Sequence, residues 1–322
     1  MKAYVYGASG AAITDVAKPA PKGTQVLVRV RACGLNRADL GMTKGHAHGS
    51  AGGVGTVLGI EWAGEIAELG PEAKGVKIGD RVMGSGGAAF AEYTLADHGR
   101  LFRNPSNMNF EDATTLPVAL ATMHNAVVTN GALQPGQSVL IQGASSGVGL
   151  MALQIAKLKG ARIVIGSSTD AVRRGRLKDF GADLAVDSSD PGWVDQVLKA
   201  TGGDGVDLIV DQVSGSVASQ NLAATRIKGR IVNVGRLGGT HADFNFDLHA
   251  ARRINYIGVT FRTRSIEEIR EIFDEVRKDI WPAVESRKLQ LPIDRVFAFD
   301  DIGKAFEHME ANRHLGKIVV TL

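Results

Sequence analysis

Residues 139–150 read VLIQGASSGVGL, and this stretch decides the fold of the second half of the chain. Its apolar run is followed by Gly143, and the pair Gly147 and Gly149 opens a helical pattern. Glycines at a strand-to-helix junction permit a tight turn, and they let a pyrophosphate approach the free N–H groups at the helix N-terminus. The stretch therefore favours a dinucleotide-binding turn over a tight turn that holds no ligand.

Short apolar runs and helical patterns alternate around this turn. Because parallel strands need crossover connections, the alternation predicts a doubly wound, parallel, six-stranded sheet of the Rossmann type. We assign residues 117–260 to this dinucleotide-binding domain. The six expected strands are 139–143, 162–166, 184–186, 207–211, 230–235 and 254–260, and one of the expected helices covers 216–229.

A different pattern, in which glycine and proline break short strands, fills residues 1–116. Its runs alternate apolar and polar residues, as in an antiparallel, barrel-type domain. After residue 260, an amphipathic helical pattern at 265–281 leads to strand-like runs at 291–299 and 316–322. We expect residues 261–322 to rejoin the first half, which makes a discontinuous domain of residues 1–116 and 261–322.

Composition excludes several classes of protein. The chain has 322 residues, a formal net charge of +3 and one cysteine, so neither a disulfide framework nor a cysteine-rich zinc site can form. It lacks an apolar stretch of about 18 residues, and its N-terminus does not resemble a signal peptide. We expect a cytoplasmic protein that binds no membrane, and the small charge does not favour nucleic acid as a partner.

The end of the second expected strand bears on the choice of cofactor. An NAD-selective site usually carries an acid there to accept from the ribose 2′-OH, whereas this chain has Ser167 and Ser168. Small hydroxyl residues leave room for a 2′-phosphate, and Arg173 or Arg174 could supply its counter-charge. Asp170 is interpreted as a helix cap. The pattern favours NADPH (NADP⁺) over NADH.

Several motifs occur together in one order along the chain. They are ACGLNRADL (32–40), LGIEWAG (58–64), GDRV (79–82), AEY (91–93), GASSGVG (143–149) and GKIVV (316–320). In this set the chain resembles the medium-chain dehydrogenase/reductase superfamily, specifically its zinc-free quinone oxidoreductase branch. The resemblance implies an α/β fold with a GroES-like β-barrel-type catalytic domain, a Rossmann domain and a homodimer. It also implies NADPH-dependent hydride transfer to the activated C=C of a quinone or an α,β-unsaturated carbonyl compound.

The resemblance also implies that no metal is bound. Zinc-dependent alcohol dehydrogenases of the superfamily have a cysteine ligand where this chain has Asn36 and a histidine ligand where it has Ile60. Isoleucine cannot ligate zinc, and Cys33 lies three residues from the matching position. Asp39 and Glu61 persist without that metal, and we expect Asp39 to be structural, with an arginine as its candidate partner.

The candidate catalytic residues are Asn36, His46 and His48. By resemblance, the Asn36 amide lies near the nicotinamide and donates to a substrate carbonyl, and the alternative is that it only organises its own loop. Some relatives place tyrosines after this motif and this chain does not, so the two histidines are the substitutes for a proton donor.

The turn and the resemblance together assign a larger set of residues to the cofactor. Thr122 matches a threonine beside the nicotinamide, and Gly235 with Arg236 ends the fifth strand at the expected crevice. The full set is Asn36, Thr122, Gly143, Ala144, Ser145, Ser146, Gly147, Val148, Gly149, Ser167, Ser168, Arg173, Gly235, Arg236 and Lys317.

Two alternative functions stay open. One is a zinc-free, NADP-dependent carbonyl or alcohol dehydrogenase acting on a small molecule. The other is a non-catalytic NADPH-binding protein with an RNA-binding side activity through the basic run that begins at Arg173. Because those arginines cluster at the expected 2′-phosphate position, RNA is not expected as their primary partner.

Overall fold

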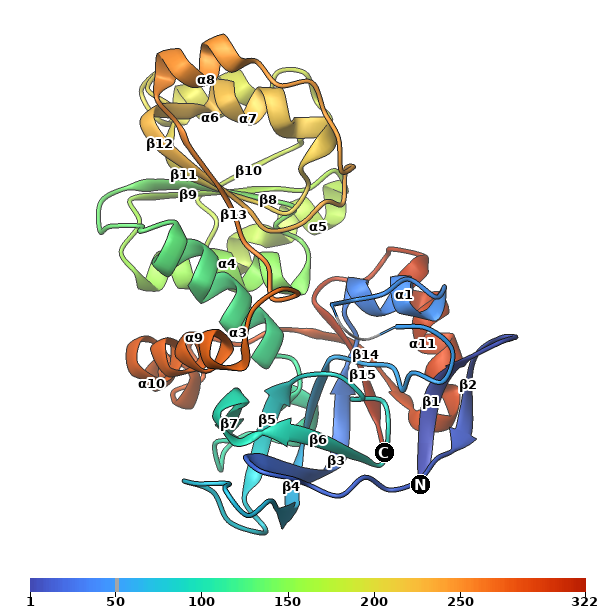
Figure 1. The fold of residues 1–322 in the computed structure, drawn as a ribbon. Coiled ribbons are helices and arrows are strands. Elements are labelled where there is room, and N and C mark those ends of the chain that lie inside the picture. The colour runs from blue at the N-terminus through green and yellow to red at the C-terminus, as the bar shows by residue number, and fades with distance from the viewer. Residues whose placement is uncertain (50–51) are drawn as a thin grey trace. The chain divides into compact units, whose positions relative to one another are not determined.

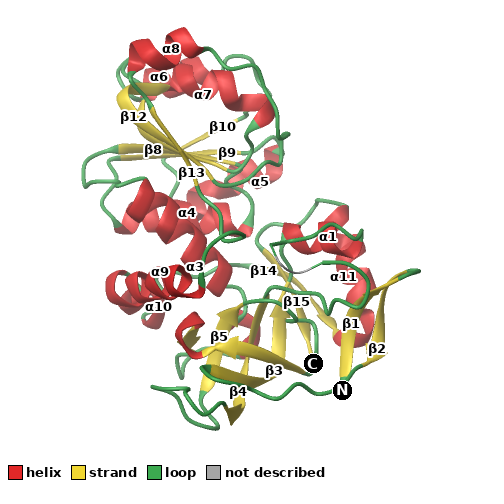
Figure 2. Ribbon diagram, in the orientation of Figure 1, coloured by secondary structure: helices red, strands yellow, loops and turns green. Residues whose placement is uncertain are grey.

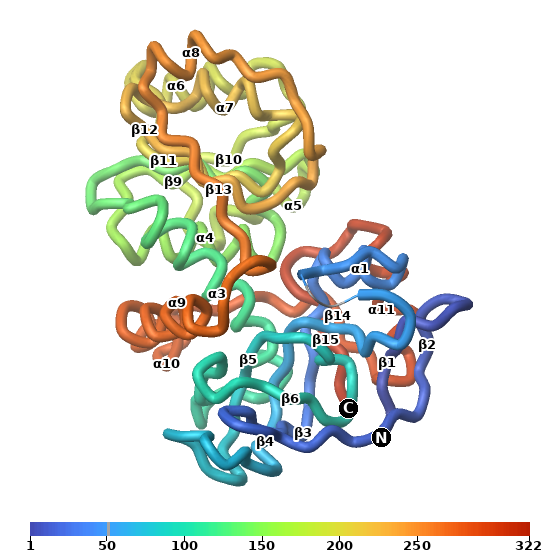
Figure 3. Tube along the Cα trace, viewed as in Figure 1, coloured from blue at the N-terminus to red at the C-terminus, as the bar shows by residue number. Residues whose placement is uncertain are grey.

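The computed structural model describes residues 1–49 and 52–322, and its chain divides into two compact units. One unit comprises Met1–Val118 together with Phe261–Leu322, and the other comprises Ala119–Thr260. The first boundary between the units, after Val118, lies two residues beyond the expected boundary at 116/117. The second boundary, after Thr260, coincides with the expected one at 260/261. The colour gradient of Figures 1 and 3 lets the reader follow the return of the C-terminal segment to strands of the first unit.

The unit Ala119–Thr260 is built on one parallel sheet. Its strand order is β10-β9-β8-β11-β12-β13, and every pair in it is parallel. The order reverses between β8 and β11, which is the switch point at which open α/β sheets bind ligands. The strands are β8 (Ser138–Gln142), β9 (Ile163–Ser167), β10 (Leu184–Val186), β11 (Val206–Asp211), β12 (Thr225–Asn233) and β13 (Asn255–Gly258).

Helices cover both faces of this sheet, as Figure 2 shows, which confirms the doubly wound arrangement. The core on one face of the sheet includes the buried residues Leu140, Ile165, Ile209, Ile231 and Trp193. The helices of this part of the chain are α3 (Pro117–His124), α4 (Gly147–Leu158), α5 (Ala171–Arg176), α6 (Trp193–Ala200), α7 (Ala218–Ala224) and α8 (Phe246–Arg252), with a π-helical segment at Asn125–Asn130 and 3₁₀ turns at Leu177–Phe180 and Gly215–Val217.

The predicted helix over 216–229 is wrong in its second half. Helix α7 ends at Ala224, and Thr225 opens β12 by pairing with Val206 of β11. Lys228 has φ 61°, and the register of β11 and β12 shifts between Val206 and Leu208, so the strand contains an irregularity. The β-branched residues and the pairing partner on β11 outweigh the helical pattern that the sequence suggests.

The other unit carries a seven-stranded sheet of order β14-β15-β3-β4-β5-β7, and β6 also pairs with β3. Its pairs are antiparallel except β14 with β15, which are parallel. A separate antiparallel pair is formed by β1 and β2. The strands are β1 (Lys2–Gly7), β2 (Gly10–Asp15), β3 (Gln25–Gly34), β4 (Glu61–Leu69), β5 (Arg81–Ser85), β6 (Tyr93–Asp97), β7 (Leu101–Arg103), β14 (Ile293–Ala298) and β15 (Lys317–Thr321).

Short helices complete this unit, and α9 is the longest of those described. A capping box of Ser265 and Glu268 starts α9, and its apolar face buries Phe273, whose ring stacks 4.5 Å from that of Phe102. The helices are α1 (Arg37–Thr43), α2 (Phe110–Ala113), α9 (Ile266–Asp279), α10 (Trp281–Glu285) and α11 (Ile302–Glu310), with 3₁₀ turns at His98–Arg100 and Phe299–Asp301. Within the described residues, no helix combines the length and the apolar character that crossing a membrane requires.

Replacing Phe273 tests this packing. Phe273→Ala empties a buried ring site, so we expect the free energy of unfolding to fall by about 3–5 kcal/mol in urea denaturation followed by circular dichroism. The matched control is Glu271→Ala on the exposed face of the same helix, which should cost less than about 0.5 kcal/mol. Equal effects of the two substitutions would contradict the packing.

Candidate functional site

The glycine turn after β8 has the geometry that its sequence predicts. Gly143 has φ 71°, a conformation that side-chain-bearing residues rarely adopt. A Cβ at Gly149 would lie 2.7 Å from the Cα and carbonyl oxygen of Ala144, so α4 packs directly on the turn. Ser146 caps α4 by accepting from the Gly149 N–H at 3.0 Å, and its hydroxyl lies 2.9 Å from Gln212 Oε1.

This arrangement leaves backbone donors at the start of α4. In the described part of the chain, the N–H groups of Gly147 and Val148 have no acceptor outside the helix, and the first turn of a helix supplies none. The helix dipole adds partial positive charge at the same end. The N-terminus of α4 can therefore bind a doubly charged pyrophosphate.

The two serines at the end of β9 have different environments. Ser167 is buried, donates to Gln142 Oε1 at 2.6 Å and accepts from the Gly143 N–H at 3.0 Å, so its hydroxyl holds the turn. Ser168 Oγ lies 3.1 Å from Ser145 Oγ. The structure thus brings the ends of β8 and β9 together. Of the two serines that the sequence assigned to a 2′-phosphate, Ser167 is used by the turn, and Ser168 contacts the hydroxyl of Ser145.

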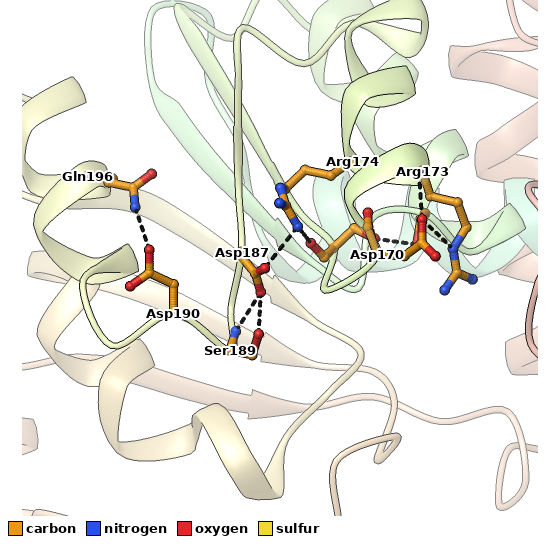
Figure 4. Close-up of polar contacts among 9 residues, drawn as sticks. Asp170, Arg173, Arg174, Asp187, Ser189, Asp190 and Gln196 are labelled. Carbon is orange, nitrogen blue, oxygen red and sulfur yellow. Dashed lines mark hydrogen bonds and ion pairs between the residues drawn. The ribbon is translucent and has the colours of Figure 1, made fainter.

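Both arginines of that site have carboxylate partners, which Figure 4 shows. Arg174 Nη1 donates to the Ser168 carbonyl at 2.8 Å and to Asp187 at 2.9 Å. Arg173 Nε lies 3.7 Å from Asp170, which caps α5 through the Arg173 N–H, so the predicted cap is confirmed. The hydrogen bond from the Arg173 backbone is the main reason that the pKa of Asp170 lies below its usual value.

The remaining candidates of this unit are Gly235 and Arg236, which follow β12, and Thr122 on α3. Gly235 is required by packing, because a Cβ there would lie 2.5 Å from the Gln212 carbonyl oxygen. Arg236 is exposed and its guanidinium lies 3.2 Å from the Val234 carbonyl. Thr122 is half-buried on α3.

In the other unit, Asn36 and Lys317 meet at a buried carboxylate. Lys317 Nζ lies 2.5 Å from Glu61 Oε2 and 2.9 Å from Asn36 Oδ1. Asn36 Nδ2 donates to the same Glu61 oxygen at 2.9 Å and to the Gly34 carbonyl at 3.3 Å. Glu61 Oε1 accepts from the Val118 N–H at 2.6 Å. The Asn36 amide is therefore fully engaged within the protein, which favours its organising role over donation to a substrate.

The structure corrects the expected partner of Asp39. Its Oδ2 accepts from the Asn36 N–H at 2.8 Å at the start of α1, and its Oδ1 has no hydrogen-bond partner among the described residues, so the arginine pairing is wrong. Burial raises the pKa of Asp39 to about 7, against the opposing effects of the Asn36 hydrogen bond and the Lys317 charge. The carboxyl group is structural, as expected.

Neither candidate histidine joins this cluster. His46 is exposed, and its backbone N–H donates to the Gly41 carbonyl at 3.0 Å. His48 is half-buried, and burial followed by the nearby Arg262 charge lowers its pKa. No hydrogen bond between either ring and Asn36, Glu61 or Lys317 occurs in the described structure. Both therefore stay candidates on sequence grounds alone.

Sequence reasoning missed four buried polar side chains, three at the ends of strands and one on α7. Gln142, Asp211, Gln212 and Asn221 are buried and hydrogen-bonded to one another or to the glycine turn. The first three stand immediately at the carboxyl end of an apolar run, in VLIQG and LIVDQ. A polar residue at that position was the available signal.

The fold and the turn define the class first: a Rossmann-type α/β protein with a GroES-like domain. Family models described as "Alcohol dehydrogenase GroES-like domain" and "Zinc-binding dehydrogenase" match residues 22–106 and 147–278. Quinone oxidoreductase-like protein 2 of Mus musculus is 30% identical over 318 residues, which cover 96% of this chain and 88% of that protein. The chain belongs to the medium-chain dehydrogenase/reductase superfamily, in its quinone oxidoreductase branch.

Two further similarities differ in extent. A phenolphthiocerol/phthiocerol polyketide synthase of Mycobacterium tuberculosis is 30% identical over 96% of this chain, but the chain spans only 14% of that protein's length. A solved structure of an alcohol dehydrogenase superfamily protein from Novosphingobium aromaticivorans is 29% identical, with a TM-score of 0.89 over 100% of this chain and 99% of that one. Both agree with the predicted family and fold.

Removing the Lys317 charge tests the buried ion pair. Lys317→Met leaves the Glu61 carboxylate buried without its cation, so unfolding should cost about 3–5 kcal/mol less in thermal or urea denaturation. The exposed pair of Lys304 and Asp301, 2.7 Å apart, is the control, and Lys304→Met should change stability by less than about 1 kcal/mol. Similar effects at both lysines would contradict the burial argument.

Asp39 predicts a pH dependence of stability. Because its folded pKa of about 7 exceeds the ordinary 3.8, the folded state holds this proton more tightly, and its contribution to stability falls as pH rises from about 4 to about 7. Asp39→Asn removes that dependence while keeping an oxygen for the Asn36 N–H. Unfolding free energies measured from pH 4 to pH 8 should therefore show the variant gaining on the parent up to pH 7 and then levelling. A constant difference would contradict the shifted pKa.

Proposed function

We propose that the chain is an oxidoreductase that uses NADPH to reduce the activated C=C of a quinone or an α,β-unsaturated carbonyl compound, without zinc. The observation that carries the proposal is the glycine turn. It presents the free N–H groups of Gly147 and Val148 at the point where the strand order reverses, in a chain of the quinone oxidoreductase branch.

The residues of the nucleotide-binding unit fit a dinucleotide in their own chemistry. The N-terminus of α4 would hold the pyrophosphate, and Ser145, Ser168 and Arg173 would face the 2′-phosphate. No carboxylate stands in place of Ser167 or Ser168 at the end of β9, and the neighbouring Asp170 and Asp187 are paired with Arg173 and Arg174. When bound, the cofactor supplies the hydride, and the protein contributes orientation and exclusion of water.

The proposed absence of zinc rests on residue chemistry. Asn36 and Ile60 stand where zinc-dependent relatives have ligands, and the Asn36 amide is bonded to Glu61 and Lys317. Hydride addition to an activated C=C needs less electrophilic assistance than alcohol oxidation does, so the proposal assigns this substrate class. His46 and His48 are retained as proposed proton donors. By analogy with the branch, we also propose a homodimer in the cytoplasm.

The basic run at the start of α5 supports NADPH over RNA as its partner. Each arginine faces an acid: Arg173 faces Asp170, Arg174 faces Asp187, and Arg176 lies 2.5 Å from Asp179. RNA affinity grows with the number of phosphates neutralised, and paired arginines neutralise fewer. A single phosphate needs only one of them, and Arg173 has the longest ion pair, 3.7 Å against 2.9 Å for Arg174 and 2.5 Å for Arg176.

Cofactor selectivity can be measured directly. Arg173→Ala should raise the Kd for NADPH by about tenfold or more, because a charge-assisted contact is worth about 1.5–3 kcal/mol, and should leave the Kd for NADH unchanged. Fluorescence titration with both nucleotides measures these constants. Arg176→Ala, at the last residue of the same helix, should change neither by more than about twofold. Equal affinity of the parent protein for NADH and NADPH would refute the assignment.

The reaction class is tested by NADPH consumption over quinones, enones, enoyl thioesters, aldehydes and ketones, with each product identified. We expect turnover with the quinones or the conjugated substrates and a saturated carbonyl product from enones. Reduction of aldehydes and ketones alone would favour the carbonyl dehydrogenase alternative. Stoichiometric zinc in active protein would refute the metal-free mechanism.

A further inference from the structure

Four buried side chains of the nucleotide-binding unit form one continuous chain of hydrogen bonds. The Gly143 N–H donates to Ser167 Oγ at 3.0 Å, and this hydroxyl donates to Gln142 Oε1 at 2.6 Å. Gln142 Nε2 then donates to Asn221 Oδ1, and Asn221 Nδ2 donates to Asp211 Oδ2, both at 2.9 Å. The chain joins β8, β9, α7 and β11.

The bonds of this chain all run in one direction. Every member donates toward Asp211, so each bond polarises the next and the carboxylate accepts at the end. Ser167, Gln142, Asn221 and Asp211 are each 0% exposed, so water cannot replace a lost partner. Breaking one link therefore leaves buried polar groups unpaired on both sides of the break.

Asp211 also holds the loop that follows its own strand. Its Oδ1 accepts from the N–H groups of Val213 at 2.8 Å and Ser214 at 2.9 Å. Ser214 has φ 60° and ψ −130°, a strained backbone conformation for a residue with a side chain. Its hydroxyl donates to the Gly235 carbonyl at 2.6 Å and accepts from Asn233. One carboxylate thus fixes the loops after β11 and β12.

We propose that Asp211, acting through Asn221 and Gln142, is a positioning residue that sets the conformation of the glycine turn at Gly143. The glycine turn and the loops after β11 and β12, which include the cofactor candidates Gly235 and Arg236, are then held by one connected set of hydrogen bonds. The role assigned to this relay rests on the proposed cofactor binding. In this proposal Asp211 does not contact the cofactor, because both of its carboxylate oxygens accept hydrogen bonds from the protein.

The relay explains why the turn needs support. Gly143 adopts a positive φ, and its N–H donates to Ser167 at the end of β9, so the free donors are those of α4. The N–H groups of Gly147 and Val148 point at a phosphate only while the turn keeps its shape. Because a misplacement of about 1 Å at such a site is costly, distant members of the relay should affect binding.

The test breaks the relay at Asn221, which lies on α7, outside the glycine turn. Asn221→Leu should raise the amide hydrogen exchange rate of Gly143, measured by NMR relative to Leu140 in the strand core, by about tenfold. It should also weaken binding of 2′,5′-ADP by about tenfold in calorimetry. The control is Thr225→Val, which removes another fully buried hydroxyl, the one that donates to the Asn221 carbonyl at 2.6 Å.

Every outcome of these measurements either supports the relay or overturns it. Thr225→Val should stay within about threefold of the parent in both measurements, although it loses comparable stability. Unchanged Gly143 exchange in Asn221→Leu, or equal effects of the two substitutions, overturns the relay. If Asn221→Leu does not fold, Gln142→Met cuts the same relay and must give the same two changes. A parent protein that does not bind 2′,5′-ADP refutes the proposed cofactor instead, while the exchange rates still test the relay.

Discussion

The close approach of α4 to the turn that precedes it is the contact on which the nucleotide-binding unit depends. Gly149 allows it, because any Cβ there would collide with Ala144 at 2.7 Å. The contact lets Ser146 cap the helix and leaves the first N–H groups free. The turn itself is held by the hydrogen bond from the Gly143 N–H to Ser167, which in turn donates to Gln142. The cap and the free donors of α4 therefore depend on this backbone approach, and the hydrogen bonds of Ser167 and Gln142 support the turn on which the helix packs.

The other unit contains a buried carboxylate, that of Glu61, whose charge is balanced within the protein. A carboxylate that stays fully buried needs a counter-charge, and Lys317 supplies it to Glu61 on an adjacent part of the sheet, with Asn36 bonded to both. Asp39, which has no such partner, keeps its proton up to about pH 7. The family motifs around Asn36 and Glu61 thus persist here as a protein-only network, in which the amide and the ammonium satisfy the carboxylate.

Local sequence patterns predicted most of the elements around the glycine turn. The apolar runs and glycines of residues 139–150 predicted β8 and the turn, and the Asp170 cap followed from its position. Where sequence reasoning failed, tertiary partners decided: Thr225 joined β11 instead of extending α7, and Asp39 bonded to Asn36 instead of an arginine. The buried amides Gln142 and Asn221 were missed because only the folded unit brings the end of β8 and helix α7 together, 79 residues apart in the chain.

We propose that the protein moves a hydride from NADPH to an activated carbon–carbon double bond. Reduction of a conjugated cyclic enone with NADPH deuterated at the transferable C4 position tests it most directly. Mass spectrometry and NMR of the product should find deuterium on the former β-carbon of a saturated ketone. Deuterium on a carbinol carbon, with the double bond intact, would contradict the claim.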